Sequence, residues 1–450
     1  MKKALQLLSI ILIVALCGLL GYIVWGNLEA SNPNAGVTPT PDNWTPPPIV
    51  TPIPTPGPTP RPNAENASVI NLALVGDLVM HTGLNAEALT DNDYNYLNVF
   101  GGLAPYFQEA DFAAVTMQTT LVQGPDYSGY PEFRSPDALA YSLRDAGFDL
   151  VNTATDHAMD SYKGGAERTL AILEDVGLQH VGTYRSNAER NNQNGIKIAE
   201  VGGIKIAFLA YTFGTNGIPI TEFDYITNVF FKDNPGDPSD IDYNKIIDYD
   251  KIKNDMETAN ALEPDIIVTF LHWGTEYYEE PMDYQRELAD FLLYEGADII
   301  VGGHPHVLEP MEMREMTDRY GREKTGLIAY SLGNFISCPG TVDFTNLTAL
   351  LRVEIEKNID TGEAYITGVK YAPFFMVDLM KEEYGIADQD WRYKLWDLHA
   401  AITSYETEGY DGLITESLYN AMCNGLTRIH TVLGAQYDMF HTDSDAEISG

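Results

Sequence analysis

Cysteine and basic residues are both scarce in this chain of 450 residues. Its three cysteines, Cys17, Cys338 and Cys423, lack the paired spacing of a disulfide framework or a zinc knuckle. Only 27 lysines and arginines accompany 65 aspartates and glutamates, which gives a net charge of -38. Phosphate backbones repel so acidic a chain, and this argues against sequence-independent nucleic-acid binding. Stability must therefore come from burial, to which the 44% of hydrophobic residues contribute.

Charge is absent from an apolar run at residues 4–25, directly after Lys2 and Lys3. The run is long enough to cross the hydrocarbon core of a bilayer. The flanking lysines favour a cytoplasmic N-terminus. We therefore expect residues 1–26 to form a transmembrane signal anchor in the cell membrane, with the C-terminal remainder extracellular. A cleaved signal peptide and a secreted protein are the alternative.

Proline, threonine and asparagine dominate the segment after this run. Such a composition offers too few apolar side chains to fold and favours an extended, polyproline-like chain. We expect residues 27–67 to form a disordered Pro/Thr-rich stalk that holds the folded part away from the bilayer.

Short apolar β-rich runs alternate with helical segments from residue 68 onward, and no internal repeat is visible. Strands are predicted at residues 69–75, 112–115, 148–153, 196–201, 204–211, 265–271, 298–301, 327–332, 347–355 and 364–371. Helices are predicted at residues 136–146, with Ser135 as N-cap and Gly147 as stop, and at residues 165–176, 251–262 and 284–294. The tail from about residue 388 is expected to be mostly helical. The pattern predicts an α/β fold with mixed strand directions.

Polar residues that could bind a metal recur immediately after the predicted strands. Ligands bind α/β folds at the carboxyl ends of strands, because the loops there converge on one crevice. One such residue alone does not indicate a metal site; a Gly-Asp pair, for example, is also typical of a turn. Carboxylates and imidazoles without cysteine suit Mn, Fe or Zn. The set comprises Asp77, Gln118, Asp156, His157, Asp160, His272, Glu276, His304, His306 and Asn334.

In this order, the residues resemble the CapA family of poly-γ-glutamate (capsule) biosynthesis proteins, within the calcineurin-like metallophosphatase superfamily. The resemblance implies a four-layer αββα metallophosphatase-like sandwich over residues 68–376, with a helical C-terminal extension at residues 377–450 packing on it. It covers roughly residues 70–376. Its motifs are Gly76-Asp77, Asp156-His157-Ala158-Met159-Asp160, His272-Trp273-Gly274-Thr275-Glu276, Gly303-His304-Pro305-His306 and Ser331-Leu332-Gly333-Asn334-Phe335.

Two positions depart from the family pattern. Where the family usually has Asn-Leu-Glu, this chain has Thr116-Met117-Gln118. A neutral glutamine in place of a ligating glutamate weakens cation binding. Where the family has Asn-Asn-His, this chain has Thr155-Asp156-His157, and Asp156 is hypothesised to restore a carboxylate.

Metal-assisted hydrolysis or transfer at an acyl or phosphoryl centre is the mechanism expected from these residues. His157 would act as general acid, and Glu276 would act as base or orient a ligand histidine. Asp160 and Asn334 would support the ligands by hydrogen bonds. One or two divalent ions, Mn, Fe or Zn, would be held by Asp77, Gln118, Asp156, His272, His304 and His306.

The resemblance implies a role in synthesis, export or processing of an anionic γ-linked glutamate polymer. The expected partners are this polymer, membrane synthase subunits and the cell membrane, with no nucleic acid. Two alternatives stay open. A non-catalytic accessory that binds the polymer or the synthase is favoured by Thr116 and Gln118. A general surface phosphodiesterase would instead turn over a chromogenic phosphodiester.

Overall fold

The computed structural model describes residues 66–441, apart from residues 92, 125, 233–245, 341, 380, 382–383, 385–390 and 409–413. The predicted anchor and nearly all of the predicted stalk lie outside the described residues. Over the described part of the chain, no helix has the length and apolar character needed to cross a membrane.

The first of two large sheets has eight strands in the order β16-β15-β14-β1-β2-β5-β6, with β13 paired to β1. Strands β1, β2, β5 and β6 run parallel, whereas β14, β15 and β16 join antiparallel. The strand bounds are β1 Ala67–Val79, β2 Phe112–Gln118, β5 Leu150–Asn152, β6 Gln179–Val181, β13 Asn334–Ile336, β14 Leu347–Asn358, β15 Ala364–Asp378 and β16 Tyr393–Asp397.

The second sheet has six strands in the order β11-β12-β10-β9-β8-β7, in which the four inner strands are parallel and the two edge strands antiparallel. The predicted hairpin is confirmed by β7 and β8, which Gly202 and Gly203 join with φ of 55° and 81°. The mixed strand directions are likewise confirmed. The bounds are β7 Lys197–Val201, β8 Ile204–Thr212, β9 Ile266–His272, β10 Ile299–Gly303, β11 Leu308–Thr317 and β12 Glu323–Leu332, beside the small pair β3 Thr120–Leu121 and β4 Arg134–Ser135.

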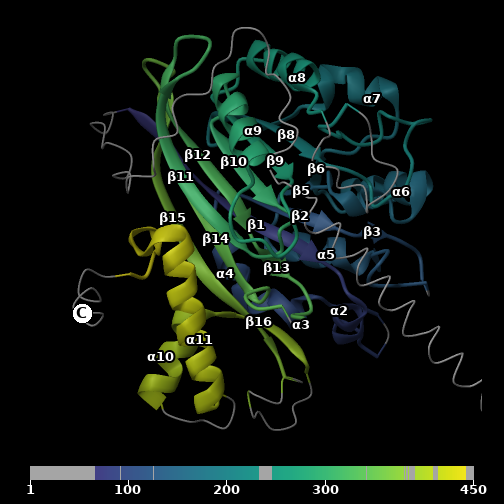
Figure 1. Cartoon of the computed structure of the whole chain (residues 1–450), viewed down its shortest axis with the longest axis vertical. Coiled ribbons are helices and arrows are strands. Elements are labelled where there is room, and N and C mark those ends of the chain that lie inside the picture. The colour runs from purple at the N-terminus through teal and green to yellow at the C-terminus, as the bar shows by residue number, and fades with distance from the viewer. Residues whose placement is uncertain are drawn as a thin grey trace, which may run out of the picture.

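Helices flank the sheets, and the last two, α10 and α11, lie at the lower end of the molecule beside β14 and β15 (Figure 1). The helix bounds are α2 Thr82–Glu87, α3 Leu97–Phe100, α4 Ala104–Gln108, α5 Ala138–Ala146, α6 Tyr162–Asp175, α7 Asn187–Asn191, α8 Tyr249–Ala261, α9 Asp283–Tyr294, α10 Leu398–Glu408 and α11 Glu416–Ile429. Short irregular turns include η2 Asp156–Met159 and the π-helix η5 His430–Gly434.

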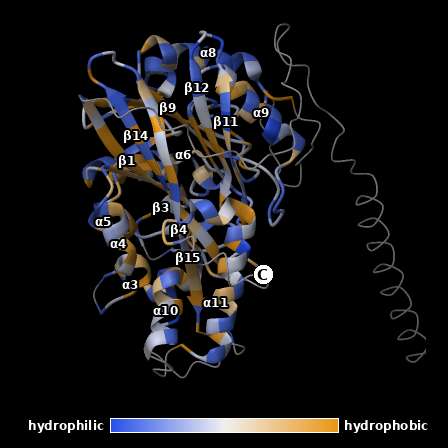
Figure 2. Cartoon of the chain, turned by 90° about the vertical axis from the view of Figure 1, so that its left-hand side faces the viewer, coloured by the Kyte–Doolittle hydropathy of each residue, from blue (hydrophilic) through white to orange (hydrophobic). Residues whose placement is uncertain are grey.

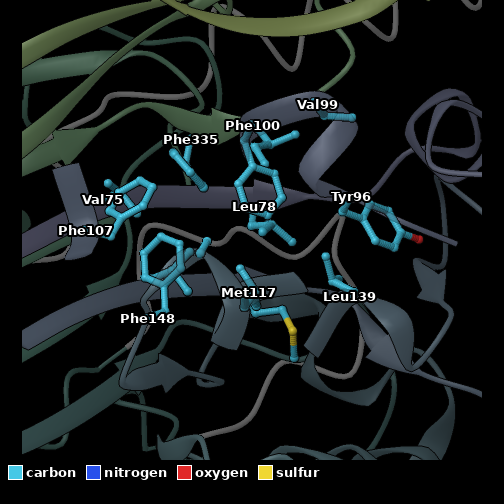
Figure 3. Packing of buried hydrophobic residues seen from close by; sticks show 14 of the residues in the cluster. Val75, Leu78, Tyr96, Val99, Phe100, Phe107, Met117, Leu139, Phe148 and Phe335 are labelled. Atoms are coloured by element: carbon cyan, nitrogen blue, oxygen red, sulfur yellow. The ribbon is translucent and has the colours of Figure 1, made fainter. Parts of the chain in front are cut away.

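Three buried clusters arrange these elements in layers. Between the two sheets, Phe208 stacks on Phe112 and Phe270, with ring centroids 5.3 and 6.3 Å apart. The outer face of the first sheet packs on α2–α5 (Figure 3), and the outer face of the second packs on α8 and α9. Hydrophobic residues accordingly run along the strands, with hydrophilic residues on the outer helix surfaces (Figure 2). The order is helices, sheet, sheet, helices.

Two sequence expectations need correction. Ser135 is not an N-cap: it is the last residue of β4, its hydroxyl lies 3.0 Å from that of Thr119, and α5 begins at Ala138. The expected boundary at residues 376 and 377 falls inside β15, and the tail also contains β16. The alternating Tyr393 and Leu395 are buried against the first sheet, so this segment extends the sheet before the helices begin.

Replacing Gly147 with alanine is expected to destabilise the protein by about 1–2 kcal/mol, because Gly147 ends α5 in the left-handed region. Its φ is 108°, and an added Cβ would lie 3.0 Å from the Gln108 side chain. Chemical denaturation would measure the loss. Gly164→Ala in α6 is the matched control, since its Cβ meets nothing within 4 Å; an equal loss there would contradict the argument.

Candidate metal centre

The ends of strands from both sheets meet at one place. Asp77 lies near the end of β1, and Gln118 ends the adjacent parallel strand β2. In the second sheet, His272 ends β9 and pairs with Gly303 at the end of β10, so His304 follows directly. The connection after β5 brings Asp156 to the same point. The convergence predicted from the sequence therefore occurs, and it joins the two sheets.

The centre of this site is buried and polar. His272 Nε2 lies 2.9 Å from Asp156 Oδ1 and 2.6 Å from the Gln118 side-chain amide. His272 Nδ1 lies 3.8 Å from Asp77 Oδ1, and His304 Nδ1 lies 3.9 Å from Asp156 Oδ2. One ligand atom each from Asp156, His272 and His304 falls within 4.8 Å of the others, a spacing that a single metal ion can span.

Several atoms at this centre are buried without any hydrogen-bond partner among the described residues. They are Asp77 Oδ1, Gln118 Oε1, His272 Nδ1 and both ring nitrogens of His304. A buried polar atom without a partner costs about 1–3 kcal/mol, so native proteins rarely keep several together without a compensating ligand. Carboxylate, amide and imidazole atoms are all metal ligands. The residues present therefore fit a divalent metal.

The turn after β10 presents two imidazoles in strained backbone conformations. His304 and His306 have φ of 94° and 60°, values that non-glycine residues seldom adopt. The amide of His304 donates a hydrogen bond of 2.6 Å to Asp77 Oδ2, which ties the turn to the first sheet. A Cβ at Gly303 would come within 2.3 Å of Asp77 Oδ1, so this approach requires glycine.

A second group of possible ligands shares His304 with the first. Glu276, His304 and His306 also offer ligand atoms within 4.8 Å of one another. His306 Nδ1 lies 2.8 Å from Asn334 Oδ1, which fixes the ring, whereas its Nε2 lies 3.9 Å from the more exposed Glu276. Two neighbouring ions could thus be accommodated, and the supporting role of Asn334 stays a prediction.

Burial and charge set the protonation of the central residues. Burial lowers the pKa of His304 well below its usual value, which leaves a neutral imidazole with a free lone pair. Burial alone would raise the pKa of Asp156, but the neighbouring His157 and His272 hold it well below its usual range. For Asp77, burial is the larger effect and raises its pKa. A neutral imidazole beside an ionised carboxylate is the state that binds a cation.

His157 is held as a cation at the edge of the centre. Its Nδ1 donates to Asp160 Oδ2 at 2.7 Å, and its Nε2 lies 3.6 Å from Asp156 Oδ2. Burial alone would lower the pKa of His157, but Asp156 and Asp160 raise it to about 9. Asp160 is itself anchored by the amides of Phe133 and Asn216. His157 can therefore donate a proton at neutral pH.

The two residues that differ from the family pattern within Thr116-Met117-Gln118 occupy different surroundings. Gln118 reaches the centre beside His272, at the position expected for a ligand. Thr116 instead accepts a hydrogen bond of 3.1 Å from the Asn152 amide, within the first sheet. Only Gln118 of the pair therefore alters the charge next to the possible ligands.

His81 also reaches the site, although the sequence analysis did not select it. Burial, together with the charges of His306 and His157, lowers the pKa of His81 to about 4. Its ring contacts Phe133, which in turn contacts His157. His81 lies just after the true end of β1 at Val79, as other site residues lie at or near the ends of their strands. Because the strand was predicted to end at residue 75, His81 was not recognised as a residue at a strand end.

A family profile and two curated relatives match the sequence of this chain. The profile of the family described as "Bacterial capsule synthesis protein PGA_cap" matches residues 71–338. The PGA biosynthesis protein CapA of Bacillus subtilis is 30% identical over 67% of this chain and 71% of its own length. The capsule biosynthesis protein CapA of Bacillus anthracis is 27% identical over 64% of each chain.

A solved phosphatase structure from Mycoplasma pneumoniae is similar over 68% of this chain and 93% of its own, at a TM-score of 0.39 and 15% identity. So distant a similarity bears on neither activity nor substrate. The family profile spans more than half of the chain and includes all of the residues gathered at the centre. The chain therefore belongs to the family of bacterial capsule synthesis proteins.

Proposed function

We propose that this protein takes part in synthesis, export or processing of a capsule polymer of the poly-γ-glutamate type, as a metal-dependent hydrolase or transferase of the metallophosphatase type. The observation that carries the proposal is the convergence of unpartnered carboxylate and imidazole atoms between the two sheets. The names of its CapA relatives support the capsule polymer as substrate class. The proposal includes the membrane anchor, an extracellular position for the folded part and contact with membrane synthase subunits.

The residues of the chain supply the acid and base functions. His157, protonated at neutral pH, would donate a proton to the leaving group. Glu276 lies beside His306 at the more open side of the site, where it could accept a proton from an attacking nucleophile. A bound divalent ion would polarise the carbonyl or phosphoryl oxygen of the substrate, so that the attached carbon or phosphorus becomes more electrophilic. Asp160 would hold the His157 ring in orientation throughout.

Charge supports a role for the metal in substrate binding as well. The chain carries a net charge of -38, so an anionic polymer is repelled from it at a distance. Divalent cations held by Asp77, Asp156 and the histidines would reverse this locally. Binding of the polymer should therefore depend on the metal, whether or not a bond is then cleaved.

Gln118 supports one alternative, a non-catalytic accessory that binds the polymer or the synthase. A neutral amide lies where the family usually has glutamate, which removes one negative charge from the centre. A centre with fewer charges binds the cation less tightly. In that case the site would bind polymer through a metal without turnover.

Turnover by the full chain, purified in detergent and loaded with Mn²⁺ or Zn²⁺, tests the proposal. Two quantities would be measured in parallel: the chain length of poly-γ-glutamate, and the release of the coloured leaving group from a chromogenic phosphodiester. We expect shortening or transfer of the polymer, and a loss of about 10²–10⁴-fold in kcat for His157→Gln at unchanged metal content.

The outcomes separate the candidates. Metal-dependent polymer binding without turnover, unaffected by His157→Gln, would replace the enzyme by the accessory. Turnover of the phosphodiester alone would identify a general surface phosphodiesterase. If the metal-loaded chain neither binds the polymer nor turns over either substrate, the proposal is rejected.

A further inference from the structure

A second group of histidine and aspartate side chains lies at the C-terminal end of the described chain, apart from the candidate metal centre. His399 belongs to α10, His430 begins the π-helix η5 directly after α11, and Asp438 follows in the final segment. One ligand atom from each falls within 4.8 Å of the others. None of the three belongs to the motifs that define the candidate centre.

Both imidazoles point at the same carboxylate oxygen. His399 Nε2 lies 2.7 Å and His430 Nε2 lies 2.8 Å from Asp438 Oδ2. Each ring approaches this oxygen through its Nε2 atom, so three possible ligand atoms lie close together. A small outward movement of the rings would admit an ion at Zn–N and Zn–O distances of about 2.0–2.2 Å.

The carboxylate is rigidly placed by the backbone around it. Asp438 is fully buried, and its second oxygen accepts a hydrogen bond of 2.9 Å from the Phe440 amide. Asp438 also bridges to Tyr371 on β15, and the Met439 amide donates to the Tyr371 carbonyl at 3.0 Å. The Tyr371 hydroxyl is buried without a hydrogen-bond partner among the described residues. The aspartate is thus fixed to the first sheet before any ligand arrives.

The π-helix presents the second imidazole. A π-helical turn is rare and frequently marks a functional site, because it rotates side chains away from the regular helical positions. Here it begins at His430 itself. The side chains of His399 and His430 keep 25% and 23% of their surface exposed, which leaves a route for an ion from solvent.

We propose that His399, His430 and Asp438 form a second metal site, selective for Zn²⁺ or a similar borderline divalent ion. Two imidazoles and one carboxylate suit such an ion, whereas Mg²⁺ and Ca²⁺ prefer oxygen ligands. Water would complete the coordination on the exposed side. The ion would cross-link α10, the end of α11 and the final segment, and so hold the C-terminal helices on β15.

Zinc content of the full chain, purified without a histidine tag, tests the site independently of the proposed function. The variant His272→Ala/His304→Ala serves as background, since it disables the candidate centre. This background is expected to retain one equivalent of Zn²⁺ after equilibration with Zn²⁺ and gel filtration. Adding His399→Gln and His430→Gln should remove that equivalent, because glutamine keeps a hydrogen bond to Asp438 but replaces the imidazole ligands.

His180→Gln is the matched control, since His180 also contacts a carboxylate, Glu174 at 3.1 Å, but no second imidazole among the described residues bonds to that carboxylate. It should leave the zinc content of the background unchanged. A background protein that retains no zinc would overturn the site. So would an equal zinc content with and without the two glutamines, verified in protein whose circular dichroism matches the wild type.

Discussion

Full-length protein carrying His272→Ala and His304→Ala is expected to bind divalent metal at the candidate centre more than about 100-fold more weakly than the wild type. Loss of supporting residues alone costs 10–100-fold, and these two side chains supply ligand atoms directly. Equilibrium dialysis with Zn²⁺ or Mn²⁺, in variants that also carry His399→Gln and His430→Gln, would measure the centre alone. His180→Ala is the control and should bind as the wild type does.

The same variants should differ in how metal affects unfolding. In metal-free wild type, both ring nitrogens of His304 and one of His272 are buried without partners among the described residues, at about 1–3 kcal/mol per atom. The two alanine substitutions remove these buried nitrogens and their cost, which offsets part of the stability lost with the packing of the two rings. Metal at 100 times Kd would stabilise the wild type by about 2.7 kcal/mol. An equal gain in the double variant would contradict the assignment of these ligands.

Restoring the family's glutamate at position 118 tests whether Gln118 weakens metal binding. Gln118→Glu adds a negative charge beside His272 at nearly constant volume. We expect tighter metal binding in this variant than in the wild type, measured by the same dialysis. Unchanged or weaker binding would show that Asp156 already supplies the charge that the centre needs.

Stability is expected to fall as pH rises from about 4.5 to 8, because of Glu309 on β11. This side chain is buried, accepts one hydrogen bond of 3.0 Å from Gln285, and has its other oxygen without a partner among the described residues. Burial raises the pKa of Glu309 to about 8 from a usual value of 4.5. The folded state therefore holds its proton more tightly than the unfolded state.

The direction follows from this difference. Below pH 4.5 both states are protonated and the stabilisation is fully present; between 4.5 and 8 only the folded state keeps the proton, and stability falls by up to about 1.4 kcal/mol per pH unit. Glu309→Gln should remove the contribution of Glu309 to this slope and so make it shallower than in the wild type. Urea denaturation of the full chain at several pH values would measure it, with exposed Glu315→Gln on the same strand as control. An identical slope in Glu309→Gln and wild type would refute the prediction.

The sequence located most of the site because its pattern and its geometry coincide. Parallel strands must present their carboxyl ends at one edge, so residues such as Asp77 and His272 converge wherever the sheet forms. The short apolar runs before them are buried on both faces and are readily recognised as strands. The motif around His304 contains Gly303, and the structure places this glycine against Asp77, where a Cβ would not fit.

Other features depend on contacts that no local pattern records. Strand β11 contains the charged residues Glu309, Glu312 and Arg314, a composition that does not predict a strand. It forms a strand because it pairs with β12. The helices α2 to α4 are too short for a periodic signal. His399 and Asp438 are far apart in the chain and meet only after α10 and α11 have packed on β15.

Because the candidate centre draws Asp77 from one sheet and His304 from the other, a bound ion would act as a mechanical link across the sandwich. Sliding of one sheet over the other by an ångström would break the coordination before it exposed much of the apolar interior. The two sheets would then unfold as one cooperative unit when metal is present. The same ion would transmit force from one sheet to the other.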